Sequence, residues 1–351
     1  MLPNAESFRR LVDGRTTGFL ATLSRAGLSA IEIPYEAIVR LRNYGYDQSI
    51  FAAKRASVSV ISVGNLTLGG TGKTPLVAWL AQWLAQRGKN PAIISRGYKA
   101  QNGQLSDEAA ELRIRVPTVP HFANKRRIIA AENAVANGAD VLVLDDGFQH
   151  RQIERDVNVV TIDATDPFGC NHLFPRGLLR EPLQGLNRAD ALILTRTDQV
   201  SLKTKNEIRE RCFQFVESRD KPWIETEHKP LNLRFLDGTI QALQTLQNKR
   251  LLLVSAIGNP AAFHATLATL GHEPVAALTF PDHHSYTTND IHHISEKAES
   301  AGAEIVVTTL KDLVKLPLAH TYTRPVCALE IGIQFRSGLE DLEKILQKIP
   351  N

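Results

Sequence analysis

The segment Thr67-Leu-Gly-Gly-Thr-Gly-Lys-Thr74 combines glycines with a terminal Lys-Thr pair, as phosphate-binding P-loops do. Its glycines let backbone N–H groups turn toward phosphate oxygens, and a helix predicted to begin near Thr74 adds the positive end of its dipole. Lys73 can reach the β- and γ-phosphates, and Thr74 can ligate Mg²⁺. We therefore expect ATP and Mg²⁺ to be bound by Thr67, Leu68, Gly69, Gly70, Thr71, Gly72, Lys73 and Thr74.

The P-loop departs from the usual pattern at its first position. Thr67 stands where G-x-x-x-x-G-K-[ST] has a glycine, and Gly69 and Gly70 can supply the missing backbone freedom. A glycine-rich turn that binds no nucleotide is the alternative. The apolar strand expected before the segment and the helix expected after it favour nucleotide binding.

Two carboxylates, Asp145 and Asp146, follow the apolar run Val141-Leu-Val-Leu144. A strand that ends in acidic residues is how a Walker B element brings charge to Mg²⁺, so both are assigned to the metal site, and Asp146 also to catalysis with Lys73. A helix cap is the alternative for a strand-terminal aspartate. Gln149 and His150 follow at the same sheet edge, where open α/β sheets bind ligands, and are predicted to contact substrate.

Phosphoryl transfer to an alcohol also needs a side chain that orients the hydroxyl and accepts its proton. The candidates are Asp107 and Glu108, which follow Ser106, and His283, which lies between Asp282 and a second histidine. Each has an ordinary alternative, because Ser-Asp-Glu is also typical of a helix N-terminus and the histidines can be surface residues.

Several basic residues are placed in loops that follow predicted strands. They are Arg96, Arg176, Arg180 and Lys311. Most exposed arginines only solvate a surface, but positions after parallel strands favour an anionic substrate in a cleft. Arg96 and Arg180 are the predicted substrate contacts.

The elements that must position these residues alternate between strand and helix. Continuous apolar strands separated by helices indicate a parallel sheet covered on both faces. The predicted strands of this series are Val58–Val63, Pro91–Ser95, Val141–Leu144, Val157–Ile162 and Ala189–Leu194, and its helices are Thr74–Arg87 and Lys125–Asn137. The fold class is therefore α/β, with a P-loop NTPase-like parallel sheet domain.

A second, smaller α/β domain is predicted after a composition break near Pro222 and Pro230. It contains strands at 250–254 and 304–308 and a helix at 260–270. An extended connector at 231–240, with a turn at Asp237-Gly238, joins it to the first domain. We expect a helical region at 1–57, a P-loop domain at 58–228, a connector strand at 229–250, the smaller domain at 251–323, and a return strand and C-terminal helix at 324–351.

The first 57 residues are predicted to be helical, with apolar residues beside arginines. Phe8, Leu11, Val12, Phe19 and Leu23 form one apolar set. Two interpretations fit this pattern. The helices can pack on the core, or they can form an amphipathic surface that touches anionic lipid headgroups.

The composition excludes several classes of protein. With 43% hydrophobic and 22% charged residues, the chain is neither disordered nor a bundle of membrane spans, and a net charge of +4 indicates no general nucleic-acid surface. Three widely spaced cysteines suggest a reducing setting, and no secretory leader or spanning segment is expected. His292 and His293 leave a zinc site as an alternative, without a catalytic spacing such as HExxH.

Taken in order, these motifs resemble those of the tetraacyldisaccharide 4'-kinases of lipid A biosynthesis. The resemblance covers residues from about 35 to 335. The matching segments begin at Val63, Ser95, Asp107, Asp145, Pro175, Ala256, Asp282 and Thr309, and read VGNLTLGGTGKTP, SRGY, DE, DDGFQH, PRGLLRE, AIGNP, DHH and TLKD.

The resemblance implies transfer of the γ-phosphoryl group of ATP to the 4'-hydroxyl of a tetraacyl glucosamine disaccharide 1-phosphate, which forms lipid IVA. It also implies a two-stranded connector between the domains and peripheral docking on the cytoplasmic face of the bacterial inner membrane through the N-terminal helices. Lys73 and Thr74 would hold nucleotide and Mg²⁺, Asp145, Asp146 and Glu108 would serve the metal, and Asp107 paired with His283 would activate the hydroxyl. The rival hypothesis is a membrane-associated P-loop ATPase that acts as a switch without a small-molecule acceptor.

Overall fold

The computed structural model describes residues 5–97, 106–317 and 322–349, so Tyr98 of the SRGY motif lies outside the described residues. The chain divides into two compact units. Unit 1 comprises residues 1–99, 115–227 and 334–351, and unit 2 comprises residues 100–114 and 228–333. Helix α4 (Asp107–Arg115) and strands β7 (Trp223–Phe235) and β12 (Val326–Ser337) contribute residues to both units.

A parallel sheet forms the centre of unit 1, with the strand order β6-β5-β1-β4-β2-β3 and the start of β7 paired to β6. Every residue of β2, β4, β5 and β6 is buried, so both faces of the sheet are covered, as the continuous apolar runs predicted. The strands are β1 (Ser59–Asn65), β2 (Pro91–Ser95), β3 (His121–Ala123), β4 (Val141–Asp145), β5 (Val157–Asp163) and β6 (Ala191–Thr195).

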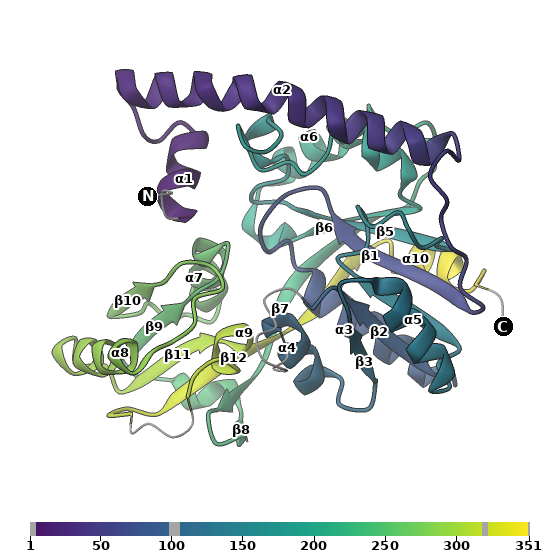
Figure 1. The fold of residues 1–351 in the computed structure, drawn as a ribbon. Coiled ribbons are helices and arrows are strands. Elements are labelled where there is room, and N and C mark those ends of the chain that lie inside the picture. The colour runs from purple at the N-terminus through teal and green to yellow at the C-terminus, as the bar shows by residue number, and fades with distance from the viewer. Residues whose placement is uncertain (1–4, 98–105, 318–321, 350–351) are drawn as a thin grey trace. The chain divides into compact units, whose positions relative to one another are not determined.

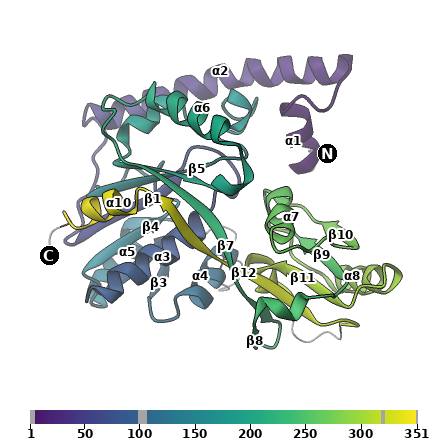
Figure 2. The same cartoon turned by 180° about the vertical axis from the view of Figure 1, so that it is seen from behind.

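The helices of unit 1 pack on this sheet through alternate strand residues. Leu142 of β4 shares a core cluster with Ala130 of α5, and Leu192 of β6 shares another with Ile208 of α6. The helices are α1 (Ala5–Val12), α2 (Phe19–Asp47), α3 (Lys73–Gln86), α5 (Arg127–Ala136), α6 (Leu202–Phe213) and α10 (Leu339–Leu346), with short 3₁₀ helices at Gly169–Asn171, Leu183–Arg188 and Thr197–Gln199. Helix α2 runs alongside α6 in both views (Figures 1 and 2), and its Tyr35 packs against the α6 cluster.

Unit 2 has its own parallel strands, in the order β10-β9-β11-β12, with the end of β7 next to β12 and β8 antiparallel to β7. The turn predicted at Asp237-Gly238 is present, because Gly238 has φ 89° and Oδ1 of Asp237 accepts a hydrogen bond from the Thr239 backbone at 2.9 Å. The remaining elements are β8 (Ile240–Gln241), a 3₁₀ helix at Leu243–Leu246, β9 (Leu251–Ser255), α7 (Pro260–Ala268), β10 (Ala276–Thr279), α8 (Thr288–Ser300), β11 (Ile305–Thr309) and α9 (Leu310–Leu313).

The predicted α/β fold is confirmed in both units, and most predicted strands and helices end within two or three residues of the observed ones. Several elements of unit 2, among them β10, α8 and α9, have no counterpart among the predicted segments, and Lys311, predicted in a loop, lies in α9. Helix α8 begins with a capping box, in which the Thr287 hydroxyl and the Asp290 carboxylate each bond the backbone N–H of the other residue. The capping-box pattern is short and lies among other polar residues, so α8 was not predicted from the sequence.

Candidate active site

The P-loop joins the end of β1 to the start of α3 in unit 1. Gly69 has φ 110° and Gly72, directly before α3, has φ 80°, a region that glycine enters without strain. Ideal side-chain positions at Gly69 and Gly70 meet no atom within 4 Å, so the outer side of the loop borders open space. Left-handed glycines and open space beside the loop are features that a phosphate-binding loop needs.

Threonines anchor the P-loop to neighbouring strands. The hydroxyls of Thr71 and Thr161 lie 2.8 Å apart, and Thr195 Oγ1 donates to the backbone oxygen of Thr71 at 3.0 Å. On the other side, the backbone N–H of Leu68 donates to the Leu178 oxygen at 2.6 Å, and Thr67 forms an isolated bridge with the neighbouring residue Leu179. Thr67, in the usual glycine position, is therefore buried and tied into the fold.

Lys73 is the first residue of α3, and its side chain turns back over the loop. Nζ donates to Oδ1 of Asn65 at 2.8 Å and lies 3.4 Å from Oδ1 of Asp146. Burial lowers the pKa of Lys73 although the Asp146 carboxylate opposes that shift. Thr74, next in the same turn, is partly exposed.

Asp146 follows β4 with φ 51°, a left-handed conformation that is uncommon outside glycine and is often found at functional sites. Both carboxylate oxygens lie 2.8 Å from Nη1 of Arg180, and Arg127 donates to the Asp146 backbone oxygen at 2.8 Å. Burial acts to raise the pKa of Asp146, but the charges of Lys73 and Arg180 outweigh it and hold the pKa far below its usual range. Asp146 is ionised at neutral pH.

Four predicted site residues, Lys73, Asp146, Gln149 and Arg180, form one network, since Oε1 of Gln149 is also 3.4 Å from Nη1 of Arg180. Asp145 ends β4 beside them and is buried. Its charge acts on Lys73, where it opposes the lowering of the pKa by burial.

His150 lies among arginines. Burial, followed by the charges of Arg127, Arg155, Arg42 and Arg96, lowers the pKa of His150 to about 4, so the imidazole is neutral at pH 7. The predicted substrate residues His150 and Arg96 therefore share a positively charged neighbourhood that suits an anionic ligand. Arg176, in contrast, donates to the backbone oxygen of Val12 at 3.1 Å and anchors α1.

Unit 2 holds the other predicted site residues, Asp107, Glu108 and His283. Oδ2 of Asp107 lies 3.1 Å from Nδ1 of His283, and Oε1 of Glu108 lies 3.6 Å from Nε2 of the same ring. His283 has φ 61°, a second left-handed residue at a predicted site. Burial acts to raise the pKa of Asp107, but the hydrogen bond with His283 and the charge of Lys315 outweigh it, and the net shift is downward.

Two lysines, Lys311 and Lys315, lie beside this Asp–His pair. Nζ of Lys315 is 3.8 Å from Oδ2 of Asp107. Nζ of Lys311 lies 3.2 Å from Asp282, 3.5 Å from Glu108 and 3.3 Å from Nε2 of His283. Burial acts to lower the pKa of Lys311, but the charges of Asp282 and Glu108 outweigh it and raise the pKa above its ordinary value. Lys311 is therefore a fixed cation among carboxylates.

Comparison with known proteins gives a consistent result. The family described as tetraacyldisaccharide-1-P 4'-kinase (LpxK) matches residues 24–350. The chain belongs to this family. A tetraacyldisaccharide 4'-kinase from Anaeromyxobacter sp. strain Fw109-5 is 39% identical over 321 residues, which cover 86% of this chain and 85% of the relative. Another from Syntrophus aciditrophicus is 39% identical over 334 residues, covering 88% and 89%.

A solved structure of the tetraacyldisaccharide 4'-kinase family is similar over almost the whole chain. The crystal structure of LpxK from Aquifex aeolicus in complex with ATP superposes with a TM-score of 0.71 at 30% identity. The match covers 92% of this chain and 98% of that chain. The fold is thus that of an ATP-binding member of the family.

Three residues of this 4'-kinase network have no role in the sequence-based prediction. Asn65 accepts the Lys73 hydrogen bond, Arg127 holds the Asp146 backbone, and Glu181 bonds Gln149 at 2.9 Å. Asn65 and Glu181 lie inside segments that resemble the family, next to Gly64 and Arg180. Their place in those segments is the sequence feature that could have identified them. For Arg127, the only such sequence feature is its place in a run of basic residues.

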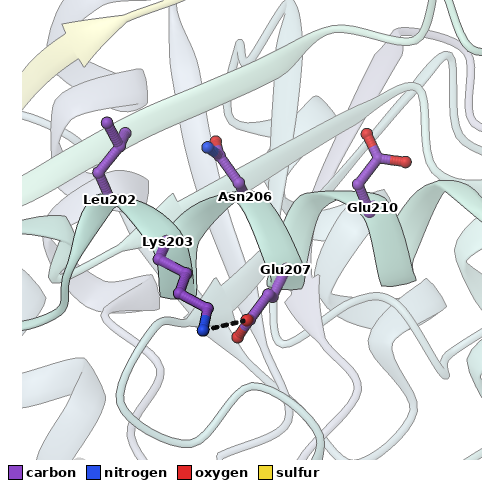
Figure 3. A pocket seen from close by; sticks show the side chains of 5 residues that line it. All are labelled: Leu202, Lys203, Asn206, Glu207 and Glu210. Carbon is purple, nitrogen blue, oxygen red and sulfur yellow. Dashed lines mark ion pairs between the residues drawn. The ribbon is translucent and has the colours of Figure 1, made fainter.

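Figure 3 shows the side chains of α6 that line a surface pocket. Lys203 and Glu207 form an exposed ion pair of 3.9 Å there, one turn apart. Its lining residues are Leu202, Lys203, Asn206, Glu207 and Glu210. None of them is a predicted site residue.

The structure gives no support to the zinc alternative. His292 and His293 are exposed on α8, and within residues 5–97, 106–317 and 322–349 no three His, Cys, Asp or Glu side chains gather as a metal cluster. In the same described ranges, no helix is long and apolar enough to cross a membrane.

Proposed function

We propose that this chain transfers the γ-phosphoryl group of ATP to the 4'-hydroxyl of a tetraacyl glucosamine disaccharide 1-phosphate, which forms lipid IVA. The observation that carries the proposal is the Lys73–Asp146–Arg180 network at the start of α3, in a chain that belongs to the 4'-kinase family. A P-loop supplies the phosphate site, and two cations beside it can neutralise the charge of a transferring phosphoryl group.

The nucleotide assignment gives each residue of the P-loop a role. Backbone N–H groups of residues 67–74 would receive phosphate oxygens, helped by the N-terminal end of α3. Lys73 would contact the β- and γ-phosphates, and Asn65 holds its ammonium group over the loop. The relative crystallised with ATP supports this assignment.

Magnesium would be held by Thr74, Asp145 and Asp146. The donor set fits, because carboxylate and hydroxyl oxygens are what Mg²⁺ prefers and Asp146 stays ionised. When bound, Mg²⁺ supplies positive charge to the β- and γ-phosphate oxygens.

Asp107 and His283 would activate the acceptor hydroxyl. The low pKa of Asp107 keeps its carboxylate ionised, so it can accept a hydrogen bond and then the proton from the hydroxyl. His283 holds that carboxylate through Oδ2 at 3.1 Å. Arg96, Gln149, His150 and Arg180 would contact the phosphorylated substrate, in the positive neighbourhood that also lowers the pKa of His150.

The outward face of α2 supports peripheral contact with the cytoplasmic face of the inner membrane. Phe19, Leu20, Ile33 and Leu41 are 70–80% exposed on this helix, which is unusual for large apolar side chains. An amphipathic helix of this kind lies in the headgroup region of a bilayer. An acylated substrate would be reached there.

The direct test is an assay of ³²P transfer from [γ-³²P]ATP to the lipid A disaccharide precursor, with a Lys73→Ala protein as the control. A labelled lipid that forms only with the wild-type protein and Mg²⁺ supports the proposal. ATP hydrolysis stimulated by liposomes without labelled lipid would favour the switch hypothesis, for which the relatives named above offer no support. Normal turnover by Lys73→Ala would refute the role of the P-loop.

A further inference from the structure

The face of α2 that packs on the rest of unit 1 carries polar side chains beside the buried apolar residues Ala21 and Val39. The Tyr35 hydroxyl donates to the backbone oxygen of Arg180 at 2.9 Å, and Nδ2 of Asn43 donates to Oε2 of Glu181 at 3.0 Å. Arg42 donates to the backbone oxygen of Gln149. Tyr35 precedes Arg42 and Asn43 by about two helical turns, so all three share one side of the helix. Helix α2 thus bonds the two segments that carry Gln149 and Arg180.

Glu181 is the centre of these contacts. Its side chain is 2% exposed, and a buried carboxylate is costly unless hydrogen-bond donors surround it. Arg188 pairs with it at 2.7 Å, and Nε2 of Gln149 donates at 2.9 Å. Asn43 supplies a further donor from α2. Removal of the Asn43 amide would therefore take one hydrogen-bond donor away from the buried Glu181 carboxylate.

The Glu181 carboxylate also sets the direction of the Gln149 amide. Nε2 of Gln149 donates to Glu181 and to the backbone oxygen of Asn65, the latter at 2.8 Å. A flipped amide would place its oxygen against the carboxylate, which repels it. Oε1 therefore faces Nη1 of Arg180, the same nitrogen that pairs with Asp146.

We propose that Tyr35, Asn43 and Glu181 are positioning residues of the phosphoryl-transfer site, so that activity requires α2 to pack on the segments of unit 1 that carry Gln149 and Arg180. Tyr35 fixes the backbone of Arg180, while Asn43 and Glu181 fix Gln149. The inference rests on the proposed function. It adds that catalytic activity depends on α2, the helix whose outward face is the proposed membrane contact. A displacement of about 1 Å in such groups can cost roughly 100-fold in rate.

The test compares Tyr35→Phe, Asn43→Ala and Asn43→Asp with the wild-type full chain in mixed micelles of the acylated disaccharide. Tyr35→Phe removes one hydroxyl, and Asn43→Asp keeps the size but places a second carboxylate against Glu181. The matched control is Glu36→Gln, on the same helix, where Glu36 pairs only with the exposed Arg40 among the described residues. For each protein we measure kcat, KM for ATP, the Tm, and sedimentation with anionic vesicles.

We expect roughly 10- to 100-fold lower kcat for Tyr35→Phe and Asn43→Ala, a larger loss for Asn43→Asp, and little change in KM for ATP, Tm or vesicle binding. Glu36→Gln should match the wild type. Wild-type kcat in Tyr35→Phe and Asn43→Ala would overturn the inference, as would losses that simply follow Tm or vesicle binding. If the wild-type protein labels no lipid, the proposed function fails, and the same variants compared for ATP hydrolysis then decide the positioning role.

Discussion

Nζ of Lys73 lies 3.4 Å from a carboxylate oxygen of Asp146, so the P-loop lysine and the aspartate after β4 form an ion pair at the predicted nucleotide site. Arg180 pairs with the same carboxylate at 2.8 Å, so the pair is part of a three-residue network. These three side chains carry two positive charges and one negative charge, which suits a site where the phosphates of ATP are predicted to bind.

Replacement of Lys73 by Met should therefore lower kcat by roughly 100- to 1,000-fold, because a cation placed for the transition state is lost. Arg180 still neutralises Asp146, so the fold should survive and Tm should change little. Lys203→Met, at a lysine whose side chain is 86% exposed, is the matched control. Steady-state kinetics of both variants check the prediction, and equal activities would exclude a catalytic role for Lys73.

Asp107→Ala should reduce kcat by roughly 100- to 10,000-fold and leave ATP affinity nearly unchanged, as expected of a group that accepts a proton in the transition state. Asp290→Ala is a matched control, since Asp290 also bonds a histidine, His284, at 3.0 Å but caps a helix. The control should lose about 1 kcal/mol of stability and keep its kcat. Equal losses in kcat and ATP affinity for Asp107→Ala would indicate a structural or metal-binding role.

The part of the site that could be predicted from sequence is contiguous in the chain. The P-loop and α3 follow β1 directly, and Asp146 follows β4, so motif and periodicity were enough. The pairing of Asp107 with His283 joins residues 176 positions apart, and it was expected only from the resemblance to a family. No local pattern contains such a contact.

Helix α2 shows why the rest could not be predicted. Periodicity placed Val12, Phe19 and Leu23 in one apolar set, but Val12 is buried while Phe19 and Leu23 are exposed. The inward face carries Tyr35 and Asn43 beside buried apolar residues, and both bond residues more than 130 positions away. An amphipathic pattern does not tell which face meets the protein when the partner groups are distant in sequence.

The acid stability of unit 1 should depend on His150, whose pKa falls from 6.5 to about 4 on folding. The unfolded chain binds a proton as the pH falls below 6.5, whereas the folded protein does not until about pH 4. This contribution is therefore present above pH 6.5 and lost as the pH falls toward 4.

For a partly exposed histidine we expect about 1 kcal/mol between pH 7.5 and 5, and His150→Gln should remove that share of the pH dependence. Urea unfolding followed by tryptophan fluorescence is the measurement, because Trp79, Trp83 and Trp223 all belong to unit 1. Identical pH dependence in His150→Gln and the wild type would contradict the prediction.

The outward face of α2 should control membrane binding. Ile33→Ser, Ile38→Ser and Leu41→Ser each remove an apolar side chain that is at least 66% exposed, so vesicle binding should weaken while Tm stays constant. Leu202→Ser on α6, where the side chain is 67% exposed, is the control. These substitutions test the outward face more specifically than deletion of residues 1–34. The deletion would also remove Glu32, which accepts a hydrogen bond from the Leu173 backbone N–H. Sedimentation with anionic vesicles checks the prediction, and unchanged binding would remove the membrane role.

Asp312 should be a structural residue of unit 2, although it lies in a segment that resembles the family motif. Its side chain is fully buried and accepts hydrogen bonds from the Ala256 backbone at 3.0 Å and the Thr309 hydroxyl at 2.7 Å. It also pairs with Lys315 at 2.8 Å. The carboxylate thus joins the loop after β9 to the start of α9.

Asp312→Ala should destabilise unit 2 by about 3–5 kcal/mol, because it leaves the buried ammonium of Lys315 without its nearest counter-charge. Asp341→Ala is the control, since Asp341 pairs with Lys344 on the exposed side of α10 and should cost less than about 0.5 kcal/mol. Hydrogen exchange resolves the loss by segment: β9 and β11 should exchange faster in Asp312→Ala while β1 and β4 of unit 1 keep their protection. Equal protection of β9 in Asp312→Ala and the wild type would show that these hydrogen bonds contribute little to stability.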